Sequence, residues 1–391
     1  MAVWINLRIF AGMKLKVVIF FAVIVALYSA FTSCVKDEPE NGEKDTKRTV
    51  LVYMVANNNL SSYSDRDIEE MQAAVQYNDL NGGRLLIYHA PISGLPALKE
   101  ITPNGIEELK VYDNEIYSTD AERMHKVFSD VLDIAPALDY GLVLWSHSDA
   151  WRETAASRST GIKPLSFGID RNYSMKITTL ADVLSDFNFS FIYFDCCHMA
   201  SIEVAYELRN VTDYIVASGT ELPAAGMPYN INVPLFFSDT PDLEQACKNT
   251  FDYYNNQVGN GKSCTMSLIA TEYIDELANI SREVFKAKVA LSDKPIQSYI
   301  RVPQMFSYDI LSDMAEYMHA ISPDAATTLR WDIAFNQVVL YKAATPSIFG
   351  QLTIDSYCGL GCYVPRTIED ANVDGYCNQS WWKDVVAYYF Q

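Results

Sequence analysis

The chain has 391 residues, of which 49% are apolar, 20% charged and 13% aromatic. So much apolar surface collapses into a core, which excludes disorder as the main state, and 17 Gly and 15 Pro are too few for a fibrous protein. The length predicts one large domain or two. The formal net charge of −19 argues against nucleic acid as a partner and favours a cationic substrate.

The N-terminus has the pattern of an export signal. An apolar run over residues 17–27 is short for a bilayer span, and it is preceded by the basic residues Arg8, Lys14 and Lys16. Small residues follow and end at Cys34, which resembles the lipid-attachment cysteine of a bacterial lipoprotein. A cleaved signal with a coincidental cysteine is the alternative.

We therefore expect residues 1–33 to be a lipoprotein signal peptide and Cys34 to carry the lipid. Residues 34–47 are rich in carboxylates and are expected to form an acidic tether. The mature protein would then be exported and lipid-anchored in the bacterial cell envelope, at the outer membrane or the cell surface.

Patterns of strands and helices alternate along the mature chain. Buried-strand patterns cover residues 49–55, 84–89, 142–145, 189–194 and 214–218, and helical spacing covers 64–77, 121–134, 180–187 and 200–209. From about residue 240 helices dominate, with strand candidates at 265–270, 338–343 and 363–364. This alternation predicts an α/β layered fold.

Two reactive side chains each follow an expected strand, and parallel sheets place ligand sites at the carboxyl ends of strands. His147 follows residues 142–145, and Cys197 follows residues 189–194. Their spacing of about 50 residues is typical of a caspase-type His–Cys pair. The histidine would serve as base and then as acid, and a helix beginning near Met199 would favour the thiolate. A strand-end histidine bonded to the backbone and an inert buried thiol are the alternatives.

The remaining cysteines give no clear metal site. Seven cysteines follow Cys34, and an odd number in an exported protein predicts at least one free thiol. Cys358 and Cys362 lack a partner pair at zinc-ligand spacing, and no EF-hand pattern occurs. We expect no cofactor, and a calcium requirement stays open.

Several segments of the sequence resemble the clostripain-type cysteine peptidases, a branch of the caspase-like clan. The resemblance rests on residues 49–62, 68–71, 142–147, 194–205 and 359–365, with Trp381-Trp382 and Tyr388-Tyr389. It implies a caspase-like α/β/α sandwich with a mostly parallel central sheet. Residues 48–240 would form the catalytic core, and a helix-rich part over 241–391 would complete the peptidase domain.

The resemblance also assigns roles to single residues. His147 corresponds to the catalytic histidine, and Cys197, at the third place of D-x-C, to the nucleophile. Asp195 stands where the family keeps the acidic floor of the pocket that receives a substrate Arg or Lys; capping the following helix is its alternative role. The backbone N–H groups of Ser148 and Cys197 would support the oxyanion.

Three departures from the family pattern leave alternatives. Ser148 replaces a glycine, and its Cβ restricts the backbone beside the oxyanion. Cys196 replaces an alanine, which makes it the alternative nucleophile. His198 replaces an apolar residue and is interpreted as a neighbour of the site, with the role of base as the alternative. These departures motivate a second hypothesis, a catalytically degenerate surface binding protein.

Relatives of this type are often cut by themselves between the histidine and the cysteine. The candidates here are Arg152, Arg158, Lys163 and Arg171, and an uncut loop is the alternative. The leading hypothesis is a lipid-anchored monomeric cysteine endopeptidase whose partner is a protein or peptide substrate with Arg or Lys at the cleavage site.

Overall fold

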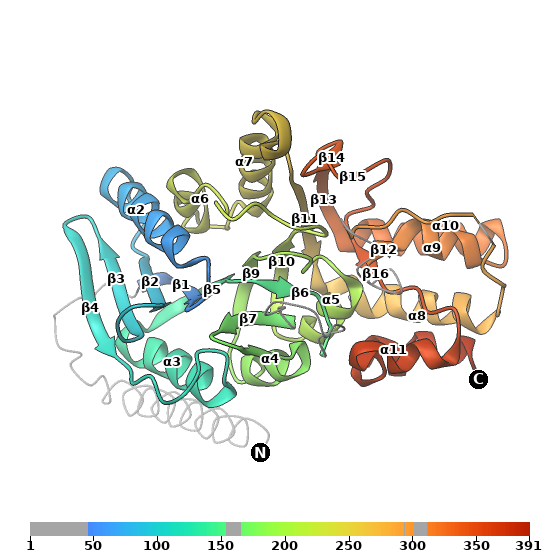
Figure 1. Cartoon of the computed structure of the whole chain (residues 1–391), viewed down its shortest axis with the longest axis horizontal. Coiled ribbons are helices and arrows are strands. Elements are labelled where there is room, and N and C mark those ends of the chain that lie inside the picture. Colours follow the sequence, from blue (N-terminus) through green and yellow to red (C-terminus); the bar gives the residue numbers. More distant parts are fainter. Residues whose placement is uncertain (1–45, 154–165, 293, 301–310) are drawn as a thin grey trace, which may run out of the picture. The chain divides into compact units, whose positions relative to one another are not determined.

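A nine-stranded sheet organises the chain from residue 46 onward (Figure 1). The computed structural model describes residues 46–153, 166–292, 294–300 and 311–391. From one edge to the other, the strands are β13 (Val339–Ala344), β11 (Thr265–Ala270), β10 (Thr212–Ala217), β9 (Phe189–Asp195), β5 (Ala137–Trp145), β1 (Thr46–Ala56), β2 (Arg84–Pro91), β3 (Ala97–Thr102) and β4 (Gly105–Val111). The five strands from β10 to β2 are parallel, and the two strands at each edge are antiparallel.

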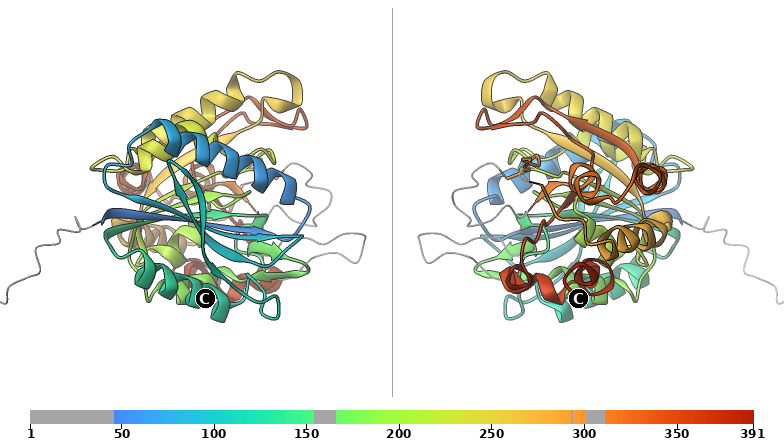
Figure 2. Two further views of the ribbon diagram at one scale, coloured as in Figure 1. Left: turned by 90° about the vertical axis from the view of Figure 1, so that its left-hand side faces the viewer. Right: turned by 90° about the vertical axis from the view of Figure 1, so that its right-hand side faces the viewer.

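Helices cover both faces of this sheet (Figure 2). One face packs against α2 (Ser61–Tyr77), α6 (Tyr229–Phe236) and α7 (Leu243–Asn255). The opposite core contains residues of α3 (Ala121–Ile134), α4 (Ile177–Leu184), α5 (Ile202–Leu208), α8 (Ile274–Lys286), α9 (Met314–Ile321), α10 (Ala325–Val338) and α11 (Ser380–Asp384). The expected α/β/α sandwich with a mostly parallel sheet is confirmed.

The two cores follow from the alternation of side chains along each strand. In β1, Leu51 and Tyr53 belong to the core on the α3 side, whereas Val50 and Val52 belong to the core on the α2 side. Because both faces are covered, the central strands are continuous apolar runs instead of alternating apolar and polar residues. This is why residues 49–55 read as a buried strand.

Short elements complete the fold. A small sheet joins β6 (Ser148–Asp149), β7 (Ser166–Asp170) and β8 (Tyr173–Met175), and two-stranded pairs join β12 (Ser312–Asp313) to β16 (Gly361–Cys362) and β14 (Ser347–Ile348) to β15 (Leu352–Thr353). The 3-10 helices are η1 (Gly259–Gly261), η2 (Thr271–Tyr273), η4 (Ile368–Asn378) and η5 (Val386–Tyr389). Within the described ranges, no helix has the length and apolarity needed to cross a membrane.

The central strands and helices agree with those expected from the sequence, whereas the elements at the edges of the sheet differ. The bounds of α3 and β11 match the expectation, whereas the antiparallel hairpin β3–β4 was not expected. The strand expected at residues 363–364 is wrong, because the pairing to β12 is made by Gly361 and Cys362. All seven cysteines beyond the tether are free thiols. Residues 1–45, including Cys34, lie outside the described residues.

Candidate active site

The register of two adjacent parallel strands sets the geometry of the site. Trp145 of β5 pairs with Asp195 of β9, and each of these residues ends its strand. His147 and Cys197 each lie two residues beyond this pair. The two side chains expected to carry the chemistry therefore emerge side by side at the carboxyl edge of the sheet.

A cavity of about 200 Å³ lies at this edge. It brings together the ends of β5 and β9, the loop after β1, the segment after β10 and the turn between β14 and β15. The lining residues are Leu60, Trp145, Ser146, His147, Asp195, Cys196, Cys197, Glu221, Leu222, Pro223, Ala224, Gly226 and Phe349. Expected site residues from both strand ends are thus in one cavity, together with residues that the sequence analysis did not single out.

His147 is held by an amide from the loop after the neighbouring strand β1. Its Nε2 lies 2.7 Å from Oδ1 of Asn59, which follows β1. Since an amide oxygen only accepts, this contact assigns the proton to Nε2 and leaves the lone pair on Nδ1. Burial lowers the pKa of His147 below its usual value of 6.5, so the ring is neutral at neutral pH and suited to act as a base.

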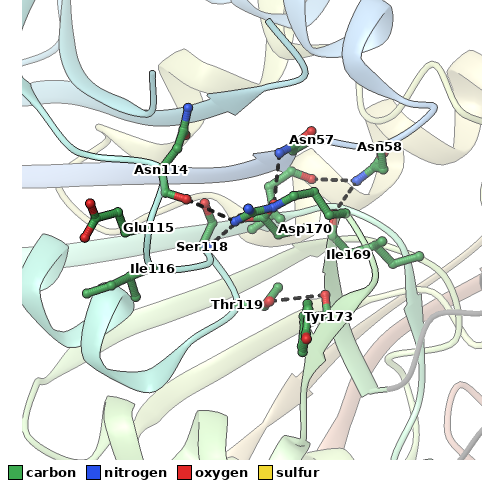
Figure 3. A network of polar contacts seen from close by, with 12 residues as sticks. Asn57, Asn58, Asn114, Glu115, Ile116, Ser118, Thr119, Ile169, Asp170 and Tyr173 are labelled. Carbon is green, nitrogen blue, oxygen red and sulfur yellow. Dashed lines mark hydrogen bonds and ion pairs between the residues drawn. The ribbon is translucent and has the colours of Figure 1, made fainter. Parts of the chain in front are cut away.

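The loop that carries Asn59 is itself anchored by β7 (Figure 3). Asn57 Nδ2 donates to Asp170 Oδ1 at 3.0 Å, and Asn58 Nδ2 donates to the carbonyl oxygen of Ile169 at 2.7 Å. Asp170 also accepts from the backbone N–H of Ser118 at 2.6 Å. These buried contacts limit the movement of the loop and so fix the amide that orients His147.

Cys197 is a neutral thiol in this structure. Burial raises its pKa to about 12, with a smaller contribution from the carboxylate of Glu221 and against the effect of a hydrogen bond from Leu222. The N–H of Leu222 donates to Sγ at 3.4 Å. The helix expected near Met199 begins only at Ile202. Because the helix field fades within a turn, it does not offset the burial, and the thiol requires a base for activation.

The two alternatives to this pair are placed differently. Cys196 is 3% exposed, and its Sγ donates to the carbonyl oxygen of Leu144 at 2.9 Å. Burial raises the pKa of the Cys196 thiol well above its usual range. His198 has a left-handed backbone, with φ of 61°, and directs Nδ1 toward the carbonyl oxygen of Gly219 at 3.4 Å. It does not line the cavity, so the geometry favours His147 as the base.

Ser148, which follows His147, forms a hydrogen bond to the segment that carries Cys197. Its Oγ donates to the carbonyl oxygen of Cys197 at 2.5 Å, and the residue is 3% exposed within β6. Ser148 is not among the described residues with positive φ, so its backbone does not need glycine. The serine therefore supplies a hydrogen bond that a glycine at this position would lack.

Asp195 forms the acidic wall of the cavity. Its Oδ2 accepts from the backbone N–H of Met227 at 3.2 Å and from the hydroxyl of Tyr229 at 3.0 Å. Burial raises its pKa to about 6, against the effect of these two donors. Gly226, with φ of 65°, approaches so closely that a Cβ there would lie 2.6 Å from Oδ2. The capping alternative is wrong, because Ser201 caps the following helix.

A second buried carboxyl group stands behind this wall. Asp67 of α2 accepts from Nε1 of Trp145 at 2.8 Å, and burial together with the charge of Asp195 raises its pKa to about 9. Asp67 is therefore protonated at neutral pH. Glu70 accepts from the backbone N–H of Tyr229 at 3.0 Å. Because Asp67 is neutral, the negative charge beside the cavity is that of Asp195, and this charge favours a cation.

The four candidate processing residues have different surroundings. Arg152 is fully buried between Asp149, at 2.5 Å, and Asp374, at 2.6 Å. Arg171 lies in the turn between β7 and β8 and stacks on Tyr117, with 3.9 Å between the guanidinium and the ring centre. The other two candidates, Arg158 and Lys163, lie outside the described residues.

Sequence reasoning missed four residues of the site. Asn59 had a signal, since its run of three asparagines closes an expected strand. Glu221 and Leu222 follow the strand expected at 214–218, and the rule that sites lie at strand ends could have found them. Phe349 had no signal, because it enters from a turn far along the chain. No group of three or more potential metal ligands occurs among the described residues.

Comparison with known proteins identifies the family to which this fold and sequence are similar. Residues 52–358 match the Clostripain family. An inactive zymogen C11 protease from Parabacteroides distasonis is 28% identical, with a TM-score of 0.74 over 88% of this chain and 98% of that chain. A secreted C11 cysteine protease from Bacteroides thetaiotaomicron, iotapain, is 25% identical, with a TM-score of 0.77 over 87% of this chain and 99% of that chain.

A second structure of a secreted C11 cysteine protease from Bacteroides thetaiotaomicron holds an irreversible peptide inhibitor. It is 25% identical to this chain, with a TM-score of 0.74 over 86% of this chain and 98% of that chain. Comparison with curated protein sequences gave no significant match. The extent of the family match, together with the fold, shows that the chain is a cysteine-type peptidase of the clostripain family.

Proposed function

We propose that this peptidase is an exported, lipid-anchored endopeptidase that cleaves after Arg or Lys, with Cys197 as nucleophile and His147 as acid and base. The observation that carries the proposal is the single cavity shared by His147, Cys197 and the buried carboxyl group of Asp195. A carboxylate in a partly dry cavity binds a guanidinium or ammonium group far better than a neutral side chain.

The proposed chemistry follows from the protonation states. The thiol of Cys197 gives its proton to Nδ1 of His147 as sulfur attacks the carbonyl carbon of the scissile bond. The imidazolium then returns this proton to the leaving amine, and the C–N bond breaks to give a thioester. Water, deprotonated by His147, hydrolyses the thioester and restores the thiol. The backbone N–H groups of Ser148 and Cys197 are proposed to support the oxyanion.

The cavity also suits the shape of a long basic side chain. Trp145, Leu60 and Phe349 offer apolar walls to the methylene groups, while Asp195 receives the charged end. Phe349 is held in place because its N–H donates to Oγ of Ser263 at 3.1 Å. Aromatic walls also favour a cation through their ring faces.

The experiment that tests the proposal uses fluorogenic peptides that differ only in the residue before the cleaved bond, namely Arg, Lys, Asp or Leu. We expect residues 35–391 to cleave only the Arg and Lys peptides. Cys197→Ala is expected to abolish cleavage, while Cys196→Ala retains most of it. Cleavage by Cys197→Ala would overturn the proposal, and an inert wild type whose thiols resist alkylation would support the degenerate binding protein.

Self-processing is proposed at Arg158 or Lys163, because Arg152 is fully buried and bound by two carboxylates. Arg171 is less suited, because it is paired with Asp170 and stacked on Tyr117. The zymogen state of the relative from Parabacteroides distasonis supports a processing step. Intact mass should show a cut between residues 150 and 175 in the wild type. The cut should be absent in Cys197→Ala and in the double variant Arg158→Ala/Lys163→Ala.

Export is supported by the signal pattern before Cys34 and by the secreted C11 proteases from Bacteroides thetaiotaomicron. Lipid attachment is supported by the position of Cys34 at the end of that pattern. Cys34→Ala should move the protein from the membrane fraction to the soluble fraction and prevent incorporation of a labelled fatty acid. Unchanged membrane association in this variant would contradict the lipid anchor.

A further inference from the structure

A second cavity opens at the same edge of the sheet. It has a volume of about 630 Å³ and is formed by the loop after β1, the start of α2, the end of β2 with the loop after it, and one residue of β3. Its lining residues are Asn58, Asn59, Ser61, Ser62, Asp65, His89, Pro91, Ile92, Ser93 and Lys99. None of these residues except Asn59 has a part in the chemistry described above.

The strand order places this cavity in line with the reacting groups. Strands β9, β5, β1 and β2 are consecutive neighbours in the sheet. Their carboxyl ends are followed in turn by Cys197, His147, Asn59 and Ile92. Because neighbouring strands lie about 4.8 Å apart, the distance from the His147 strand to β2 is about 10 Å, the length of about three extended residues.

The mechanism indicates in which direction a bound peptide would run along these strand ends. A histidine that protonates the leaving amine must lie beside the part of the substrate on the C-terminal side of the cleaved bond. On the other side of His147 from the nucleophile strand lies Asn59, which contacts its Nε2 and also lines the second cavity. The segment of the substrate C-terminal to the cleaved bond is therefore expected to extend from His147 toward this cavity.

We propose that the second cavity is a substrate subsite that binds the peptide segment C-terminal to the cleaved bond, with a side chain about three residues beyond it. This inference rests on the proposed peptidase mechanism and adds a second determinant of substrate choice. The walls are joined, because the N–H of Ile92 donates to Oγ of Ser61 at 3.2 Å, which ties the loop after β2 to the start of α2.

Two opposite charges in the cavity indicate what the subsite recognises. Within the described part of the chain, neither Asp65 nor Lys99 forms an ion pair, so both charges remain available to a ligand. His89 also lines the cavity, and its Nε2 lies 2.9 Å from Oγ of Ser64. Burial lowers the pKa of His89 to about 4, so it adds no charge at neutral pH. Asp65 is exposed, whereas Lys99 is half-buried, so water screens the charge of Asp65 more strongly. The charge of Lys99 therefore dominates and favours an acidic side chain in this cavity.

The test compares a short and a long substrate that share the same residues before the cleaved bond. The short one ends in a small fluorogenic amide after Arg, and the long ones continue for four residues with Glu or Gln at the third place. For the wild type we expect a higher kcat/KM for the Glu peptide than for the Gln peptide. Lys99→Gln should lower kcat/KM for the Glu peptide about fivefold and leave the short amide unchanged.

Two further variants complete the test. Asp65→Asn should raise kcat/KM for the Glu peptide, since it removes a repelling charge. Lys288→Gln, on an exposed lysine after α8 that lines neither cavity, should change nothing. Equal effects of Lys99→Gln on short and long substrates would overturn the subsite, as would equal cleavage of the Glu and Gln peptides. Failure of the wild type to cleave the short Arg amide would instead overturn the peptidase proposal on which it rests.

Discussion

His147 Nε2 and Asn59 Oδ1 lie 2.7 Å apart, so an amide from the loop after the strand next to that of the histidine fixes the proton on Nε2. The base for Cys197 is then Nδ1. Asn59 acts through His147 and does not touch the substrate bond, which makes it a positioning residue. For the short Arg amide, which does not reach the second cavity, its contribution should therefore appear in kcat and in the pH profile more than in KM.

Asn59→Ala is expected to lower kcat about tenfold with KM little changed, because the ring loses its orientation and tautomer. Asn59→Asp keeps the acceptor and adds a negative charge, which raises the pKa of His147 and moves the acidic limb of the kcat profile to higher pH. Steady-state kinetics from pH 5 to 9 measure both effects. Asn104→Ala, in the exposed β3–β4 turn, serves as control. An unchanged kcat in Asn59→Ala would contradict the positioning role.

The charge of Asp195 should set the acidic limb of kcat/KM for Arg substrates. Its pKa of about 6 lies above the usual 3.8, so the carboxyl group loses its charge as the pH falls through about 6. We expect kcat/KM to fall below this pH. Asp195→Asn should lower kcat/KM for Arg and Lys peptides about 100-fold at pH 7.5 and abolish the preference over Leu. A variant that still prefers Arg would place the specificity elsewhere.

The central strands and the pair of reactive residues were predictable because they depend on local signals. The run from Val50 to Val55 is apolar, and each reactive residue lies shortly after a mostly apolar run. Which other residues reach the cavity depends on how the strands pair. Because this pairing joins segments that are far apart in the chain, local patterns do not predict it. The entry of Phe349 into the cavity depends on a turn about 150 residues beyond Cys197, which no local pattern encodes.

The pKa values of the site residues could not be predicted from the sequence either. The sequence analysis expected a helix to favour the thiolate of Cys197, whereas burial dominates and raises its pKa. Burial depends on the segment at Glu221 and Leu222 that folds over the sulfur. The same holds for Asp67, whose pKa is raised by burial and by the charge of Asp195, against the effect of its hydrogen bond from Trp145.

Asp67 should make stability depend on pH. Its pKa in the folded protein is about 9, against the usual 3.8. The folded protein thus holds a proton that the unfolded chain releases, so this residue costs stability increasingly as the pH rises from about 4 to about 9. Asp67→Asn keeps an acceptor for Trp145 and holds no titrating proton.

The Tm of Asp67→Asn relative to the wild type should therefore increase between pH 5 and pH 8, as measured by differential scanning calorimetry. Asp182→Asn, at an exposed position of α4, should show no such trend. A pH-independent difference for Asp67→Asn would mean that Asp67 is ionised in the folded protein.

Ser148 should contribute to stability through its bond to Cys197 and should not need replacement by glycine. Ser148→Ala is expected to lower the free energy of unfolding by about 1 kcal/mol, because a buried carbonyl group loses its donor. Ser148→Gly should bring no increase in kcat. Ser190→Ala, which removes a hydroxyl bonded to the carbonyl of Tyr140 away from the cavity, should cost similar stability without affecting kcat. A rise of kcat in Ser148→Gly would show that the side chain obstructs the oxyanion.

The assignment of the nucleophile is tested most directly by locating a covalent label. The mature chain is treated with a peptide acyloxymethyl ketone that carries Arg next to the reactive group, and the modified residue is identified by peptide mass mapping. The account predicts one label per chain, on Cys197 alone, with the six other thiols unmodified and no label in Cys197→Ala. A label on Cys196, or labelling that persists in Cys197→Ala, would contradict it.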